Sequence, residues 1–146
     1  PWAFDSLTGA LFGAATFVIA FVLSGTLSDY NASEDMVQQF ANAVEAMADI
    51  NRLSAVTQSN YDGEPLRNKL ADLLGHTESW LRNTISLEEL EQHLDQLNPL
   101  IADMKRKGEA SAAKDSLTEL ARLRQLISRM HINRSTSFLG PAYALL

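Results

Sequence analysis

The side chains that could carry chemistry in this 146-residue chain are few and widely spaced. Its three histidines, His76, His93 and His131, fall on separate predicted helices and show neither HExxH nor any other paired spacing typical of a zinc site. The chain has no cysteine, and it lacks phosphate-binding, nucleophile-elbow and dinucleotide-binding glycine motifs. We therefore expect no enzyme and no metal or other cofactor, with each histidine on the surface or in packing.

The charges are unevenly spread along a chain of net charge -6. Residues 29–104 hold 14 acidic and four basic side chains, whereas residues 105–134 hold eight basic and three acidic ones. The cluster Lys105–Lys107 is too short to predict nucleic-acid binding and suits a helix C-terminus, where positive charge meets the helix dipole. A solvated helix face explains the acidic stretch better than a cation reservoir does.

One long uncharged segment runs from Ser6 to Ser28. Its 23 residues would rise about 35 Å as a helix, enough to cross the ~30 Å hydrocarbon core of a bilayer with some tilt. A secretory signal peptide is disfavoured because its apolar region is shorter, follows Lys or Arg and ends in a cleavage site. We predict a transmembrane helix within residues 1–28.

The span carries two features that could matter for function. Small residues recur every three or four positions and predict a face for packing against another helix, at Gly9, Gly13, Thr16, Ala20, Ser24 and Ser28. In the alternative interpretation, Phe17 and Phe21, one turn apart, contribute to a pore wall or its hydrophobic neck.

A second apolar segment closes the chain, at residues 138–146. We interpret it as the truncated start of a second transmembrane helix, and the chain as a fragment of a longer membrane protein. Between the two segments lies an insert of about 110 residues, 29–137, which holds every Lys and Arg. The predicted fold class is therefore all-α, with a transmembrane helix, a helical bundle and the start of a second span.

Apolar residues at helical spacing divide the insert into about four helices. Asn31 and Glu34 resemble a capping box for the first, Pro65 suits the first turn of the second, and Ser86 with Glu89 resembles a capping box for the third. The third should kink or split at Pro99 and end at Gly108, and the last begins at about Ser111. The last helix should bury Leu117, Leu120, Leu123, Ile127 and Met130.

Basic residues lie next to the second membrane entry, with Arg129 and Arg134 within about ten residues of Phe138. Positive residues favour the cytoplasmic side, although loops longer than about 60 residues follow this tendency poorly. We accordingly expect a bacterial inner membrane protein whose helical insert is cytoplasmic.

Two passages resemble bestrophin-type anion channels. The passage from Phe21 to Tyr30 (FVLSGTLSDY), followed by an amphipathic helix, resembles the end of the pore-side membrane helix. The passage from Leu126 to Tyr143 (LISRMHINRSTSFLGPAY) is similar to the one that leads from cytoplasmic helices into the next span. A tryptophan pair of the family is missing after the first span, so we describe the chain as a divergent, bestrophin-like bacterial membrane protein.

The resemblance implies a homo-oligomer, pentameric in the channels, that lies in the lipid bilayer and conducts anions such as chloride through a hydrophobic constriction. Two other classes stay open. The insert could be the four-helix ligand-binding bundle of a transmembrane sensor, outside the cell between two spans. It could also be a structural or assembly module that recruits partners.

Overall fold

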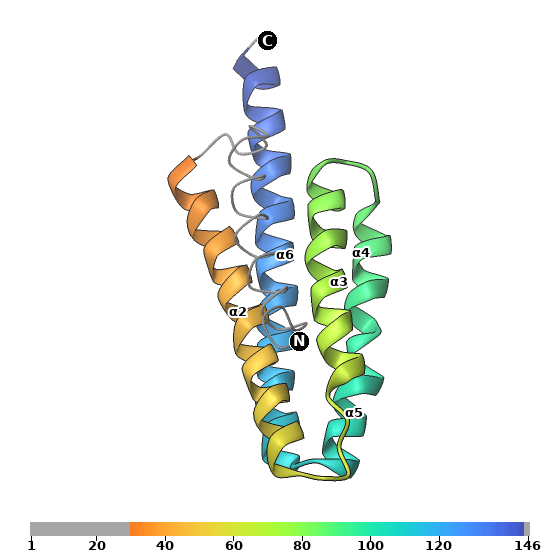
Figure 1. Ribbon diagram of the computed structural model, residues 1–146. Coiled ribbons are helices and arrows are strands. Elements are labelled where there is room, and N and C mark those ends of the chain that lie inside the picture. The colour runs from red at the N-terminus through yellow and green to blue at the C-terminus, as the bar shows by residue number, and fades with distance from the viewer. Residues whose placement is uncertain (1–29, 145–146) are drawn as a thin grey trace, which may run out of the picture.

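The computed structural model describes residues Tyr30–Ala144, with side chains placed from residue 35 to residue 133. Within this range the helices are α2 (Tyr30–Thr57), α3 (Glu64–Leu81), α4 (Leu87–Asp95), α5 (Leu97–Lys107) and α6 (Ala110–Ala144). They form four antiparallel arms, with α4 and α5 sharing the third arm (Figure 1). Tyr30 and Ala144 therefore lie at the same end of the bundle, and the predicted all-helical bundle is confirmed.

The predicted membrane segments fall mostly outside the described part of the chain. Residues 1–29, which include the predicted span, lie outside it. Residues 138–144, expected to start a second span, continue α6 without a break. Between Tyr30 and Ala144, no helix combines the length and the apolar run that a bilayer crossing needs.

Most helix ends follow from local side-chain chemistry. At the start of α3, Asp62 Oδ1 accepts a hydrogen bond from the Glu64 backbone N–H at 3.0 Å, and Pro65 occupies the first turn. Ser86 caps α4 as predicted, since its Oγ accepts from the Glu89 backbone N–H at 3.1 Å. The predicted cap at Asn31 is wrong, because α2 is already helical from Tyr30 and Asn31 lies inside it.

Pro99 divides the third arm. Proline has no N–H to donate, and inside a helix its ring clashes with the carbonyl of the fourth residue before it, here Asp95. Helix α4 ends at Asp95, and α5 begins at Leu97 with Pro99 in its first turn, where a missing N–H costs nothing. The predicted break is thus confirmed, three residues ahead of the proline.

The core runs the length of the bundle between the four arms. Helix α6 packs mainly on α2 and α5, and α3 packs on α4, α2 and α5. The largest fully buried side chains come from every helix: Phe40, Met47, Leu66, Leu70, Leu73, Leu90, Leu94, Leu97, Ile101, Met104 and Leu123. Each buried aliphatic or aromatic side chain contributes about 1.5–3 kcal/mol of hydrophobic free energy.

Leu117 was predicted to be buried, and this is wrong, because 49% of its surface is exposed. The buried stripe of α6 passes through Ser116, whose hydroxyl lies 3.5 Å from Met104 Sδ. Leu117 follows Ser116 by about 100° around the helix and so points out of the core. A small serine fits against Met104 where a leucine would be oversized.

A buried polar cluster closes the lower end of the bundle. The Tyr61 hydroxyl donates to Asn51 Oδ1 at 2.5 Å, and Asn51 Nδ2 donates to the Gly63 carbonyl at 2.8 Å. Burial, followed by the charges of Asp103 and Asp62, raises the pKa of Tyr61 to about 12. These bonds attach the loop between α2 and α3 to α2.

Two glycines give opposite expectations for the same substitution. A Cβ on Gly108 would lie 2.6 Å from Ser54 Oγ and 2.7 Å from the Met104 carbonyl oxygen, whereas a Cβ on Gly75 would meet nothing within 4 Å. Gly108→Ala should lower the free energy of unfolding by about 1–3 kcal/mol through this overpacking. Gly75→Ala, within α3, should raise it by up to about 1 kcal/mol. Urea unfolding of both variants checks the pair, and equal effects would contradict the packing at Gly108.

Candidate functional site

A cleft opens between α4 and α6 in the half of the bundle above the break at Gln96. Its volume is about 190 Å³, and its lining comes from three residues of α4 and four of α6: Leu87, Glu91, Leu94, Arg124, Ile127, Ser128 and His131. Both halves of the third arm pack on α3, but only α5 also packs closely on α6, so α4 diverges from α6. The cleft is the space that this divergence leaves beside α6.

The floor of the cleft is apolar and its rim is polar. Leu94 and Ile127 are 1% and 2% exposed, and Leu87 is half-buried beside them. Glu91, Ser128 and His131 are exposed at the rim. The combination suits a small molecule with an apolar body and a polar or charged end.

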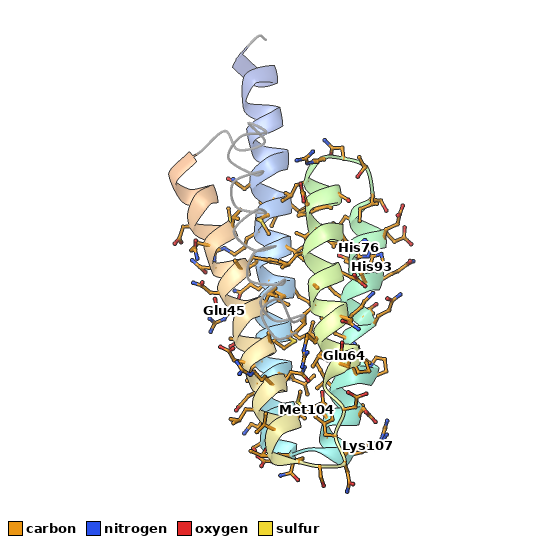
Figure 2. All side chains as sticks on the ribbon, viewed as in Figure 1. Glu45, Glu64, His76, His93, Met104 and Lys107 are labelled. Atoms are coloured by element: carbon orange, nitrogen blue, oxygen red, sulfur yellow. The ribbon has the colours of Figure 1, made fainter. Side chains whose placement is uncertain are left out.

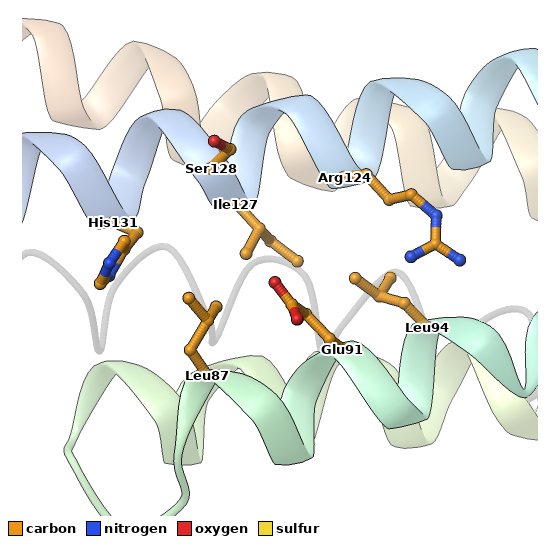
Figure 3. A pocket seen from close by; sticks show the side chains of 7 residues that line it. All are labelled: Leu87, Glu91, Leu94, Arg124, Ile127, Ser128 and His131. Carbon is orange, nitrogen blue, oxygen red and sulfur yellow. The ribbon is translucent and has the colours of Figure 1, made fainter.

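The charged groups of the cleft differ in their pairing. Arg124 Nη2 donates to Asp95 Oδ1 at 2.8 Å, joining α6 to the last residue of α4. Glu91 makes no ion pair with another residue of the described range. Figure 3 shows Glu91 reaching from α4 toward Ile127, with Arg124 on one side of it and His131 on the other. The uncompensated charge in the cleft is therefore negative.

Two histidines that the sequence places on separate helices meet between α3 and α4. The rings of His76 and His93 stack with centroids 3.6 Å apart and an angle of 9° between their planes (Figure 2). A metal ion must lie about 2.0–2.1 Å from each ligating nitrogen and near the plane of each ring. Two parallel rings this far apart cannot direct their nitrogens at one ion. Within the described residues no group of three or more metal-ligating side chains is found.

Lys69 completes this second cluster. Its ammonium group lies 3.1 Å from His93 Nδ1 and also donates to Gln96 Oε1. Burial, followed by the positive charges of His76 and Lys69, lowers the pKa of His93. The lowered pKa favours the neutral form of His93, and in that form Nδ1 can accept a hydrogen bond from the lysine.

The predicted site residues are only partly described by the structure. Phe17 and Phe21, and the packing residues Gly9, Gly13, Thr16, Ala20 and Ser24, lie outside the described range. Arg129 is exposed on α6 and takes no part in the cleft, while Arg134 lies in α6 where side chains are not placed. Of the singled-out residues, His131 joins the cleft, and His76 and His93 join each other.

No sequence pattern predicts the cleft. Glu91, Arg124 and Ser128 have no motif spacing, since α4 and α6 bring them together from 37 residues apart at their extremes. The usable signal was Pro99, whose predicted break separates α4 from α5. The direction in which α4 would then lean depends on packing and is not encoded locally.

Comparisons with protein-family models, with curated proteins and with solved structures return no match.

Neighbouring residues on α6 allow a test of how the cleft is built. Leu123 is fully buried, whereas the Arg124 side chain is 38% exposed. Leu123→Ala should lower the free energy of unfolding by about 2–5 kcal/mol because it leaves a cavity. Arg124→Gln should lower it by at most about 1 kcal/mol, because an exposed ion pair contributes little. Thermal unfolding measures both, and a large loss for Arg124→Gln would make that residue structural.

Proposed function

We propose that the bundle is the ligand-binding domain of a transmembrane sensor, in which α6 transmits occupancy of the cleft toward the membrane. The predicted span at residues 6–28 would precede α2, and the segment from residue 138 would lead into a second span. The competing proposal is a bestrophin-like, homo-oligomeric anion channel with the bundle in the cytoplasm.

The way the core closes supports the sensor. Amphipathic helices must bury their apolar faces either on one another or on sister subunits. Here the four arms bury them within one chain, and the large hydrophobic side chains left exposed between residues 35 and 133 are Leu53, Val56, Leu117 and Ile132. A bundle that is complete in itself suits a ligand-binding domain better than it suits a ring whose core depends on neighbouring subunits.

The observation that carries the proposal is the position of α6. This helix supplies Arg124, Ile127, Ser128 and His131 to the cleft. It then continues to Ala144, past the ends of the other helices at the upper end of the bundle (Figure 1). A ligand that changes the spacing of α4 and α6 would therefore move a helix that leaves the bundle.

The cleft favours a small organic cation with a short apolar body. Its volume corresponds to roughly six water molecules at ~30 Å³ each. Glu91 offers an unpaired carboxylate beside Ile127, and Ser128 offers a hydroxyl acceptor. Arg124 is already engaged by Asp95, so an anionic ligand would have to displace that carboxylate and would face Glu91 as well.

A cysteine label on the lower loop tests which side of the membrane holds the bundle. The chain has no cysteine, and Asp62 is exposed. In intact cells, Asp62→Cys should react with a membrane-impermeant maleimide if the bundle faces outward. Gly63 is unsuitable, because a Cβ there would lie 3.0 Å from Asn51 Nδ2.

Permeabilised cells provide the control, since the same cysteine must react there in either orientation. Ser59→Cys, exposed on the same loop, should give the same result. Labelling that appears only after permeabilisation would reject the sensor and favour the cytoplasmic bundle of the channel.

Binding of matched probes tests the charge preference of the cleft. Butylammonium should shift the amide NMR signals of residues 87–94 and 124–131, whereas butyrate should not. Glu91→Gln should weaken butylammonium binding about tenfold, because it removes a charge-assisted hydrogen bond. Glu88→Gln, exposed on the same helix but outside the cleft lining, is the control. Stronger binding of butyrate would overturn the proposed ligand class.

A further inference from the structure

The contact between α3 and α4 brings three basic side chains together at one point. Lys69 and His76 from α3 face His93 from α4, with the ring centroids 3.6 Å apart and Lys69 Nζ 3.1 Å from His93 Nδ1. While His93 is neutral, its Nδ1 accepts a hydrogen bond from the lysine. Once His93 is protonated, Nδ1 becomes a donor, and the same contact becomes a repulsion between two cations.

Few negative charges offset that repulsion. The hydrogen bond with the Gln96 side chain and the charge of Glu89, one turn earlier on α4, both raise the pKa of His93, but they rank behind burial, His76 and Lys69, which lower it. On α3, Asp72 is exposed one turn before His76. On α5, the first acidic residue is Asp103, ten residues beyond His93, and it pairs with Arg106 and Lys107.

Helix α4 is the element best placed to respond. It has only nine residues, of which Leu90 and Leu94 are the buried ones, and it is separated from α5 by the break at Gln96. A short element with few buried contacts opens at a lower free-energy cost than the long helices around it.

We propose that His76, His93 and Lys69 form an acid-operated latch, which holds α4 against α3 near neutral pH and loosens it when His93 takes up a proton. The latch stands on the stacked geometry and does not depend on the sensor proposal. Because another face of α4 supplies Leu87, Glu91 and Leu94 to the cleft, loosening α4 also changes the width of the cleft.

The direction of the pH dependence follows from the lowered pKa of His93. In the open state His93 is exposed to water, and its pKa returns to the ordinary histidine value of about 6.5. The open state therefore takes up a proton more readily than the closed state does. The free energy that favours the closed state is therefore largest above about pH 6.5, and it decreases as the pH falls below that value.

Amide hydrogen exchange of the full chain at about pH 5 and about pH 7.5, corrected for intrinsic chemical rates, tests the latch. Exchange in α4 should be faster at the lower pH by about threefold or more relative to α2 and α6. The double variant His76→Gln/His93→Gln should lose this difference, and Glu88→Gln, which removes an exposed charge on α4 outside both the stack and the cleft lining, should keep it. An unchanged difference in the double variant, or none in the natural chain, overturns the proposal.

A second measurement tests the latch even if the double variant does not fold. In the natural chain, NMR titration of the His93 ring should give a midpoint below that of a free histidine, and α4 amide signals should shift over the same range. A midpoint at or above the free value contradicts the latch.

Discussion

Pro99 imposes the constraint on which the functional features of this bundle depend. Because its ring excludes the Asp95 carbonyl from a continuous helix, the third arm ends at Asp95 and restarts at Leu97. The lower half, α5, is then free to pack on α6, and the upper half, α4, packs on α3. The cleft beside α6 and the histidine stack against α3 are two consequences of that division, and they involve different sides of α4.

The two sides of α4 also differ in the kind of interaction they use. Toward α6, the Arg124–Asp95 pair is partly exposed and bridges helices that are otherwise held apart by the cleft. Toward α3, the contact is a close stack of two imidazoles with an ammonium group beside it. Neither contact has the hydrophobic burial that holds α2, α5 and α6 together. The buried Leu90 and Leu94 hold helix α4 in the core, and the ion pair and the histidine stack add contacts that depend on charge, which makes the helix responsive to ligands and to pH.

The sensor and channel proposals differ in what they ask of the bundle. A sensor needs a self-contained domain with a ligand cleft and a helix that leads out of it, and the geometry from Tyr30 to Ala144 is compatible with each of these requirements. A channel of the bestrophin type needs a hydrophobic constriction, for which the sequence offers Phe17 and Phe21, outside the described residues. The Leu53 and Val56 side chains, exposed at the lower end of α2, leave room for contacts between copies in either case.

The sequence by itself determined the helices and most of their ends, because these depend on neighbouring residues. Helical spacing of apolar residues predicted the bundle, Ser86 and Pro65 marked helix starts, Pro99 predicted the break and Gly108 marked an end. Two local errors have local causes: Asn31 lies within a helix that begins earlier, and Leu117 lies one residue beyond a buried serine. The tertiary structure alone decided which side chains meet. His76 meets His93 where α4 packs on α3, and Glu91 faces Arg124 and His131 across the cleft between α4 and α6, and both arrangements depend on how whole helix faces pack.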